Sequence, residues 1–147
     1  LQADLWISST AADAVLSVRI GEVLPSGRVV PITNGLQLVS LRAVDESRSR
    51  YVFGEMVQPY HFLTQDKEQM LQPDEVAKVS VEIFPTSVMI REGSKLRISI
   101  SPSNQAQGVL NLVQRENVKG GATTLHHSVD YPSSLVLLNV PMSVLSD

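Results

Sequence analysis

The sequence predicts an all-β protein built as a two-sheet antiparallel sandwich, and three observations lead to this prediction. Apolar and polar residues alternate through residues 76–83 and again through 95–101, as expected where successive side chains of a strand point to opposite faces of a sheet. Similar short stretches recur along the chain, with turn residues at intervals of about 8 to 12 residues. The long middle segment and the last apolar run indicate that the chain crosses between sheets, which favours a jelly-roll topology.

The first strands are predicted at residues 3–7 and 14–20. In the second of them, Leu16, Val18 and Ile20 occupy the alternate positions that face inward. The turn after this strand is expected at Pro25-Ser26-Gly27-Arg28, because proline presets φ at the second turn position and glycine accepts a positive φ.

A second tight turn is predicted at Asn34-Gly35, the strongest local turn dipeptide of the chain. Short strands are therefore expected on either side of it, at residues 29–32 and 36–43.

Residues 45–75 break the alternating pattern. The segment begins with alternating charge, contains several aromatic residues and ends in residues 64–70, the one stretch with helical composition. Structureless loops beyond about 12 to 15 residues are uncommon. We therefore expect this segment to pack over one end of the sandwich as a lid, with a functional loop as the alternative.

The alternating stretches at 76–83 and 95–101 are expected to pair with each other as a hairpin. Phe84-Pro85 would end the first strand, because proline cannot continue a hydrogen-bond ladder, and Glu92-Gly93-Ser94 supplies a turn. These strands and the strand at 14–20 predict the shared core. Its expected members are Leu16, Val18, Val79, Val81, Ile83, Leu96, Ile98 and Ile100.

The last third of the chain predicts three further strands. They are expected at residues 108–114, at 123–129 as an edge strand, and at 134–140, where a dense apolar run is typical of a strand buried on both faces. A turn is expected at residues 117–121.

Composition bounds the function without naming it. The 147 residues suffice for one domain with a hydrophobic core. The net charge of −3 and the scattered arginines give no electrostatic footprint for nucleic acid, and no apolar run reaches the roughly 18 to 20 residues that span a bilayer. The chain has no cysteine, which excludes disulfides and thiolate chemistry but leaves the compartment open, cytoplasmic or secreted.

The sequence shows no active site. There is no Gly-x-Ser-x-Gly motif of the kind that presents a serine nucleophile. Ser128, His127 and Asp130 contain the residue types of a catalytic triad, but neighbours on a strand point away from each other, so a polar edge strand and its turn is the preferred interpretation.

Metal and sugar sites are equally weak predictions. His61, His126 and His127 lack a familiar ligand spacing. The acidic residues also fail to form a calcium loop; they are Asp13, Asp45, Glu46, Asp66, Asp74 and Asp130. Trp6, the only tryptophan, could stack on a sugar but is more often a packing residue in such a position. We therefore expect no catalytic, cofactor-binding or metal-binding residue in this chain.

Three segments together resemble the C-terminal β-sandwich domain, of jelly-roll or galactose-binding-like topology, of the X-Pro dipeptidyl-peptidase and cocaine-esterase (CocE/NonD) family of serine hydrolases. They are residues 3–35, 71–103 and 127–141. The features that carry the resemblance are Ser8-Ser9, Asp13, Pro25-Ser26-Gly27-Arg28, Asn34-Gly35, the Gly93 turn followed by Leu96-Arg97, and the His, Pro-Ser and apolar-strand order of the tail.

The resemblance implies an accessory role. In this family the nucleophile, base and acid lie in a preceding α/β-hydrolase domain, so no catalytic residue has a counterpart here. The implied role is a non-catalytic domain that packs on the hydrolase domain of the same chain and supports it. The whole enzyme would hydrolyse ester, amide or X-Pro peptide bonds through an acyl-enzyme.

We expect residues 1–147 to be a single domain cut from a longer hydrolase chain, because the sequence enters almost directly in strand-like residues. A sheet edge and an apolar surface that normally meet the hydrolase domain would then be open, and self-association through them is expected, giving a homo-oligomer. Residues 44–70 are the candidate to cover part of that surface. The alternatives are a carbohydrate-binding or an assembly β-sandwich module, because fold alone does not fix function.

Overall fold

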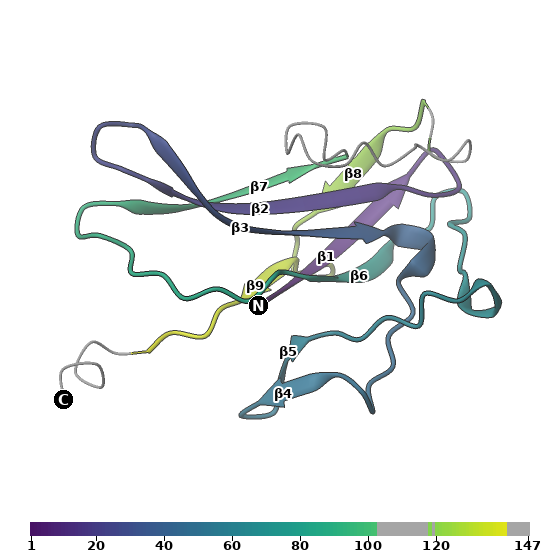
Figure 1. The fold of residues 1–147 in the computed structure, drawn as a ribbon. Coiled ribbons are helices and arrows are strands. Elements are labelled where there is room, and N and C mark those ends of the chain that lie inside the picture. The colour runs from purple at the N-terminus through teal and green to yellow at the C-terminus, as the bar shows by residue number, and fades with distance from the viewer. Residues whose placement is uncertain (103–117, 119, 141–147) are drawn as a thin grey trace.

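The computed structural model describes residues 1–102, 118 and 120–140, and it confirms the all-β prediction (Figure 1). The strands are β1 (Gln2–Ser9), β2 (Val15–Val23), β3 (Val29–Leu38), β4 (Arg50–Val52), β5 (Glu55–Gln58), β6 (Ala77–Glu82), β7 (Lys95–Ser101), β8 (Thr123–His126) and β9 (Ser134–Val136). Two short 3-10 turns, Val39–Leu41 and Gln65–Lys67, are the only helical segments in the described part of the chain. Within it, no helix has the length and hydropathy that a bilayer crossing requires.

Two antiparallel sheets form the body of the molecule. One has the order β6-β1-β8, with β9 pairing with β1 on the same side as β8, and the other has the order β3-β2-β7. Their apolar faces meet in one core cluster that draws residues from both sheets, as a sandwich requires. The β4–β5 hairpin is a separate two-stranded sheet that lies below the other strands in the view of Figure 1.

The predicted core is confirmed in β2 and in residues 79–83, which belong to different sheets, and is wrong at the edge strand β7. The buried members are Leu16, Val18, Val79, Val81 and Ile83. By contrast Leu96, Ile98 and Ile100 are 40%, 46% and 36% exposed. They do lie on the inward face, because Ile98 pairs with Ile20 and Ile100 with Val18. However, β7 is an edge strand among the described residues, and alternation predicts the face of a side chain but not whether anything covers it.

The predicted hairpin between the two alternating stretches is wrong. β6 pairs with β1 and β7 pairs with β2, so the chain crosses from one sheet to the other between them. A buried carboxylate holds this crossing: Glu22 accepts hydrogen bonds from the Arg91 backbone N–H at 3.0 Å and from the Arg91 guanidinium at 2.7 Å. The bonds from Arg91, led by the backbone one, lower the pKa of the Glu22 carboxyl.

The turn at Pro25-Ser26-Gly27-Arg28 is confirmed, with Gly27 at a φ of +83°, but the turn at Asn34-Gly35 is wrong. Both residues lie inside β3, where the chain crosses the end of β6. A Cβ atom at position 35 would lie 2.0 Å from the carbonyl oxygen of Glu82. Glycine is therefore required here for the close approach of two backbones and not for a turn.

Three other local predictions fail or are shortened. Residues 64–70 contain only a 3-10 turn, because so short and exposed a segment has no apolar stripe to hold a helix on the core. The strand expected at 134–140 ends at Val136, and the apolar residues after it are exposed. The strand expected at 123–129 ends at His126. The strand expected at 108–114 and part of the turn at 117–121 lie outside the described residues.

Candidate functional site

The structure does not assemble the triad that the sequence could have formed. Ser128, His127 and Asp130 are all exposed. The hydroxyl oxygen of Ser128 accepts a hydrogen bond from the backbone N–H of Tyr131 at 3.2 Å, so Ser128 closes the turn between β8 and β9. The preferred interpretation, a polar edge strand and its turn, accounts for these residues.

A different serine meets a histidine. Ser8 Oγ lies 2.9 Å from His126 Nε2, and Tyr131 packs beside His126 with ring centroids 5.6 Å apart. The pairing of β1 with β8 brings these residues together across 118 positions of sequence, which no local spacing could reveal. Ser8 lies on a regular strand and not on the sharp strand-to-helix elbow that exposes a serine nucleophile, so this pair joins two strands of the sheet.

The metal and sugar candidates are likewise dispersed. Among the described residues, no group of three or more His, Asp or Glu side chains is placed to share a metal ion. Asp13 is buried, and its Oδ1 accepts hydrogen bonds from the backbone N–H groups of Ala14 and Ser40 at 2.8 and 2.7 Å. Trp6 packs against Tyr131 with ring centroids 5.4 Å apart, so part of its ring is already covered.

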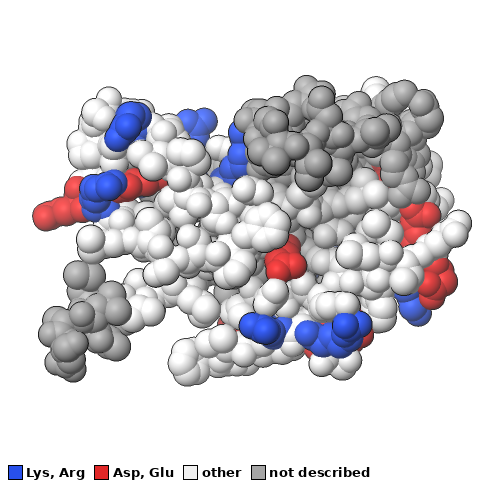
Figure 2. Space-filling model, in the orientation of Figure 1, with Lys and Arg blue, Asp and Glu red and all other residues white. Residues whose placement is uncertain are grey.

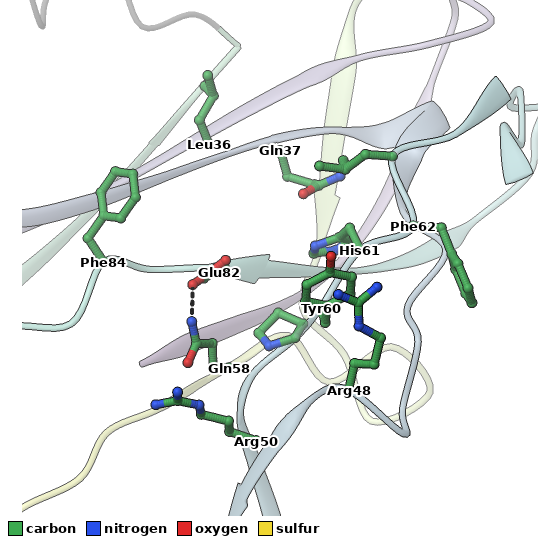
Figure 3. Close-up of a pocket in the computed structure, with 12 residues that line it drawn as sticks. Leu36, Gln37, Arg48, Arg50, Gln58, Tyr60, His61, Phe62, Glu82 and Phe84 are labelled. Carbon is green, nitrogen blue, oxygen red and sulfur yellow. Dashed lines mark hydrogen bonds between the residues drawn. The ribbon is translucent and has the colours of Figure 1, made fainter.

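The candidate site that remains is a hollow of about 810 Å³, a feature that no sequence pattern indicated. Its walls come from β3, from residues 48–63 and from the end of β6 (Figure 3). Apolar and polar groups share its lining. Among the apolar ones are Leu36, Phe62 and Phe84. The hollow is half-open, and it lies on the flank of the sandwich formed by β3 and β6.

Charged groups of both signs line this hollow. Gln58 donates a hydrogen bond of 2.6 Å to the Glu82 carboxylate, which the close-up places in the middle of the view. The guanidinium of Arg48 lies 3.8 Å from the centre of the Tyr60 ring, in cation–π geometry, and Arg50 lines the hollow from β4. On the face drawn in Figure 2, charged side chains form small separate groups and no continuous basic surface.

His61 lines the hollow and is buried, with 8% of its surface exposed. Burial lowers the pKa of His61, and this effect outweighs the opposing contributions of a hydrogen bond to the Ser80 backbone and of the Glu82 charge. The imidazole is therefore neutral near pH 7, and it serves the packing of this wall.

Asp45 organises the wall that carries these side chains. Its Oδ1 accepts hydrogen bonds from the hydroxyl and the backbone N–H of Ser47, at 2.6 and 3.0 Å, and the hydroxyl bond is the main cause of the lowered pKa of Asp45. The backbone of Asp45 also bonds to Tyr60 at 2.8 Å, and Val44 forms an isolated bridge with His61. These contacts join residues 43–49 to residues 60–62, and whether the segment acts as a lid stays a prediction.

Exposed aromatic side chains accompany the hollow. Phe53, at the tip of the β4–β5 hairpin, is 101% exposed, and Phe84 is 61% exposed. Tyr51, Tyr60 and Phe62 are 48%, 40% and 36% exposed. Three of them, Tyr60, Phe62 and Phe84, line the hollow, and exposed apolar surface of this kind is typical of an interaction site.

Comparisons with known proteins agree with this picture. Residues 1–136 match the family model described as the X-Pro dipeptidyl-peptidase C-terminal non-catalytic domain. A protein named as a serine esterase from Mycobacterium bovis is 31% identical over 97 residues, covering 66% of this chain and 15% of that protein. The cocaine esterase of a Rhodococcus species is 21% identical over 145 residues, covering 93% of this chain and 22% of that protein.

A solved structure shows the same fold in a larger protein. A CocE/NonD family hydrolase from Staphylococcus aureus aligns with a TM-score of 0.62 and 22% identity, over 81% of this chain and 21% of that one. The chain thus spans between 15% and 22% of the length of these relatives. The chain belongs to the family of X-Pro dipeptidyl-peptidase C-terminal non-catalytic domains.

Proposed function

We propose that this chain is the accessory domain of a longer serine hydrolase, in which it packs on the catalytic domain and supports it. The longer protein would hydrolyse ester, amide or X-Pro peptide bonds through a serine nucleophile that lies outside these residues. Residues 1–147 would form one domain of that protein, and the isolated domain would self-associate through surfaces that the catalytic domain covers.

The observation that carries this proposal is the match of residues 1–136 to a non-catalytic domain family, in a chain that spans only 15% to 22% of its relatives. The arrangement of the described residues supports it. They form a sandwich with one apolar core and exposed aromatic side chains on one flank, and they hold no nucleophile on an elbow. A support role needs no reactive group, only a rigid body and a surface for its partner.

The test compares a longer hydrolase chain that contains this domain with the same chain ended before Leu1. We expect the shortened protein to lose most of its thermal stability and to inactivate faster, while its catalytic residues stay in place. An equal half-life of the two proteins at elevated temperature would refute the support role. Adding the separately produced 147-residue chain back is the matched control, because recovery shows that the domain acts by binding.

Carbohydrate binding remains the alternative, and one observation favours it. Trp6, Tyr131 and His126 form a cluster of rings next to the Ser8 hydroxyl, and such rings can stack on sugars. A titration with mono- and oligosaccharides followed by Trp6 fluorescence separates the two functions. Saturable quenching that is lost in a Tyr131→Ala variant, which keeps Trp6 as the reporter, would favour the alternative.

A further inference from the structure

We infer that the flank formed by the hollow and the β4–β5 hairpin is the surface on which the catalytic domain docks, with Phe53 as its projecting anchor. This inference rests on the proposed function and adds to it the face and the residue. Three independent observations lead to it: the backbone at Phe53, the position of Leu1 and the charges of the hollow.

The hairpin tip holds an aromatic residue where the backbone disfavours one. Phe53 has a φ of +52° and Gly54 a φ of +84°, as in the mirror-type turns that favour Asn-Gly. A bulky residue at positive φ is an outlier. Its side chain is 101% exposed, so it gains no packing within this chain in return. Strain that is not offset locally is typical of functional positions, and an anchor for a partner accounts for it.

The chain enters the domain beside this hairpin. The nitrogen of Leu1 donates a hydrogen bond of 2.9 Å to the carbonyl of Val57 on β5, and the Leu1 carbonyl accepts one of 3.0 Å from the N–H of Ile83. In the longer protein of the proposed function, polypeptide ahead of Leu1 would therefore depart next to β5 and the end of β6. A catalytic domain attached there is held close to the hollow without a long linker.

The charges of the hollow indicate what the docking surface contributes. Glu82 offers a carboxylate for a donor, while Arg48 and Arg50 offer donors for a carboxylate. Phe84 and Phe62 add apolar surface at the two sides of the hollow (Figure 3). The complementary surface combines apolar side chains with charged groups of both signs, which is the composition of an interface between domains.

A second apolar surface lies on the opposite flank and is the competing face. Ile98 on β7 and Leu125 on β8 are 46% and 43% exposed. β7 and β8 lie at the other edge of their sheets from β3 and β6. No strained backbone accompanies this flank among the described residues, and Leu1 lies away from it, beside β5.

Site-specific photo-crosslinking in a longer hydrolase chain decides between the two flanks. A photoreactive phenylalanine analogue replaces Phe53 in one sample, Ile98 in a second and Val129 in a third, and mass spectrometry maps the crosslinked peptides. Val129 is 96% exposed in the connection between β8 and β9 and serves as the exposure-matched control. We expect crosslinks from position 53 to peptides ahead of Leu1, and none from positions 98 and 129.

The outcomes separate this inference from the proposed function. Crosslinks to the catalytic domain from position 98 and not from 53 would overturn the assigned flank and leave the accessory role standing. Crosslinks from 53 only to a second copy of the chain would also overturn it. An absence of crosslinks to the catalytic domain from all three positions, together with unchanged stability after removal of the domain, would overturn the proposed function itself.

A substitution at the hairpin tip gives a second test that does not depend on crosslinking yield. Asparagine accepts a positive φ, so Phe53→Asn relieves the backbone in either context. In the isolated 147-residue chain we expect an unchanged or raised unfolding midpoint. In the longer chain we expect a thermal half-life several-fold shorter, since the anchor is lost. If Phe53→Asn changes stability in the same direction in both proteins, the inference is overturned.

Discussion

Gly35→Ala is the sharpest test of how the two sheets are joined. At this position β3 crosses the end of β6, and the new Cβ would lie 2.0 Å from the Glu82 carbonyl oxygen and 3.2 Å from the Ile83 Cα. Both neighbours are backbone atoms, so no side-chain rotation can relieve the contact. The strands must move apart by roughly 1.5 Å to reach an ordinary contact distance.

The magnitude follows from what that movement breaks. The N–H of Phe84 bonds to the Asn34 carbonyl at 3.0 Å, and the Thr33 hydroxyl bonds to the Phe84 carbonyl at 2.8 Å. Each bond is worth about 0.5 to 1.5 kcal/mol, and overpacking costs about 1 to 3 kcal/mol. Alanine has less conformational freedom than glycine in the unfolded chain, and this effect alone raises the unfolding free energy by about 0.4 to 1 kcal/mol. We expect a net destabilisation of about 2 to 4 kcal/mol.

Urea unfolding of the 147-residue chain measures this change. Trp6, the only tryptophan, lies in β1 against Tyr131 and reports the loss of the sandwich. The midpoint should fall at a constant m-value, and the melting temperature should fall by roughly 4 to 16 °C for a chain of this size.

Gly21→Ala is the graded control. Its Cβ would lie 3.1 Å from a Val29 side-chain carbon and from the Val30 carbonyl, so a shift of a few tenths of an ångström accommodates it. The expected cost is therefore smaller than at Gly35. If Gly35→Ala is as stable as Gly21→Ala, the close approach of β3 to β6 is wrong.

Three further predictions concern stability and chemistry. Burial lowers the pKa of His61, so the unfolded chain takes up a proton first as pH falls below about 6.5, and the unfolding free energy should drop there. His61→Gln should remove this part of the pH dependence. Equal urea midpoints for wild type and variant at each pH would contradict the prediction. Ile7→Ala, at a fully buried site, should lower the unfolding free energy by about 2 to 4 kcal/mol. The same truncation at Ile98, which is 46% exposed, should lower it by about 1 kcal/mol or less. Equal unfolding free energies for the two variants would show that β7 is covered. The 147-residue chain should not hydrolyse p-nitrophenyl esters or X-Pro amides, because Ser8 lacks an elbow; fluorophosphonate labelling of Ser8 that disappears on heat unfolding would prove the opposite.

The sequence predicted the strands well where alternation was strong and a sheet face was buried. β1, β2, β6 and β7 lie within a few residues of their expected positions, because period-two patterning depends only on local geometry. Partner choice depends on the whole chain instead. β6 and β7 alternate equally clearly, yet they belong to different sheets, and nothing in either strand indicates which neighbour it takes.

Gly35 shows the same limit at a single residue. Asn-Gly is a strong turn signal, but the glycine is explained by the Glu82 carbonyl, which lies 47 positions further along the sequence and 2.0 Å from the missing Cβ. The hollow could not be predicted for a similar reason, since its walls come from three separate parts of the chain. The sequence did mark residues 44–70 as an excursion with its own aromatic residues, and residues 48–63 of it contribute to the hollow.

The two exposed apolar flanks differ in kind, and this difference supports the docking assignment. Ile98 and Ile100 face inward on a regular edge strand, so their exposure depends only on how much of the facing sheet covers them. Phe53 is different, because its backbone conformation is unfavourable whatever surrounds it. An inward-facing residue on an edge strand is accounted for by the fold alone. An aromatic residue held at positive φ on a hairpin tip is not, and this is why we assign the docking surface to the flank that carries Phe53.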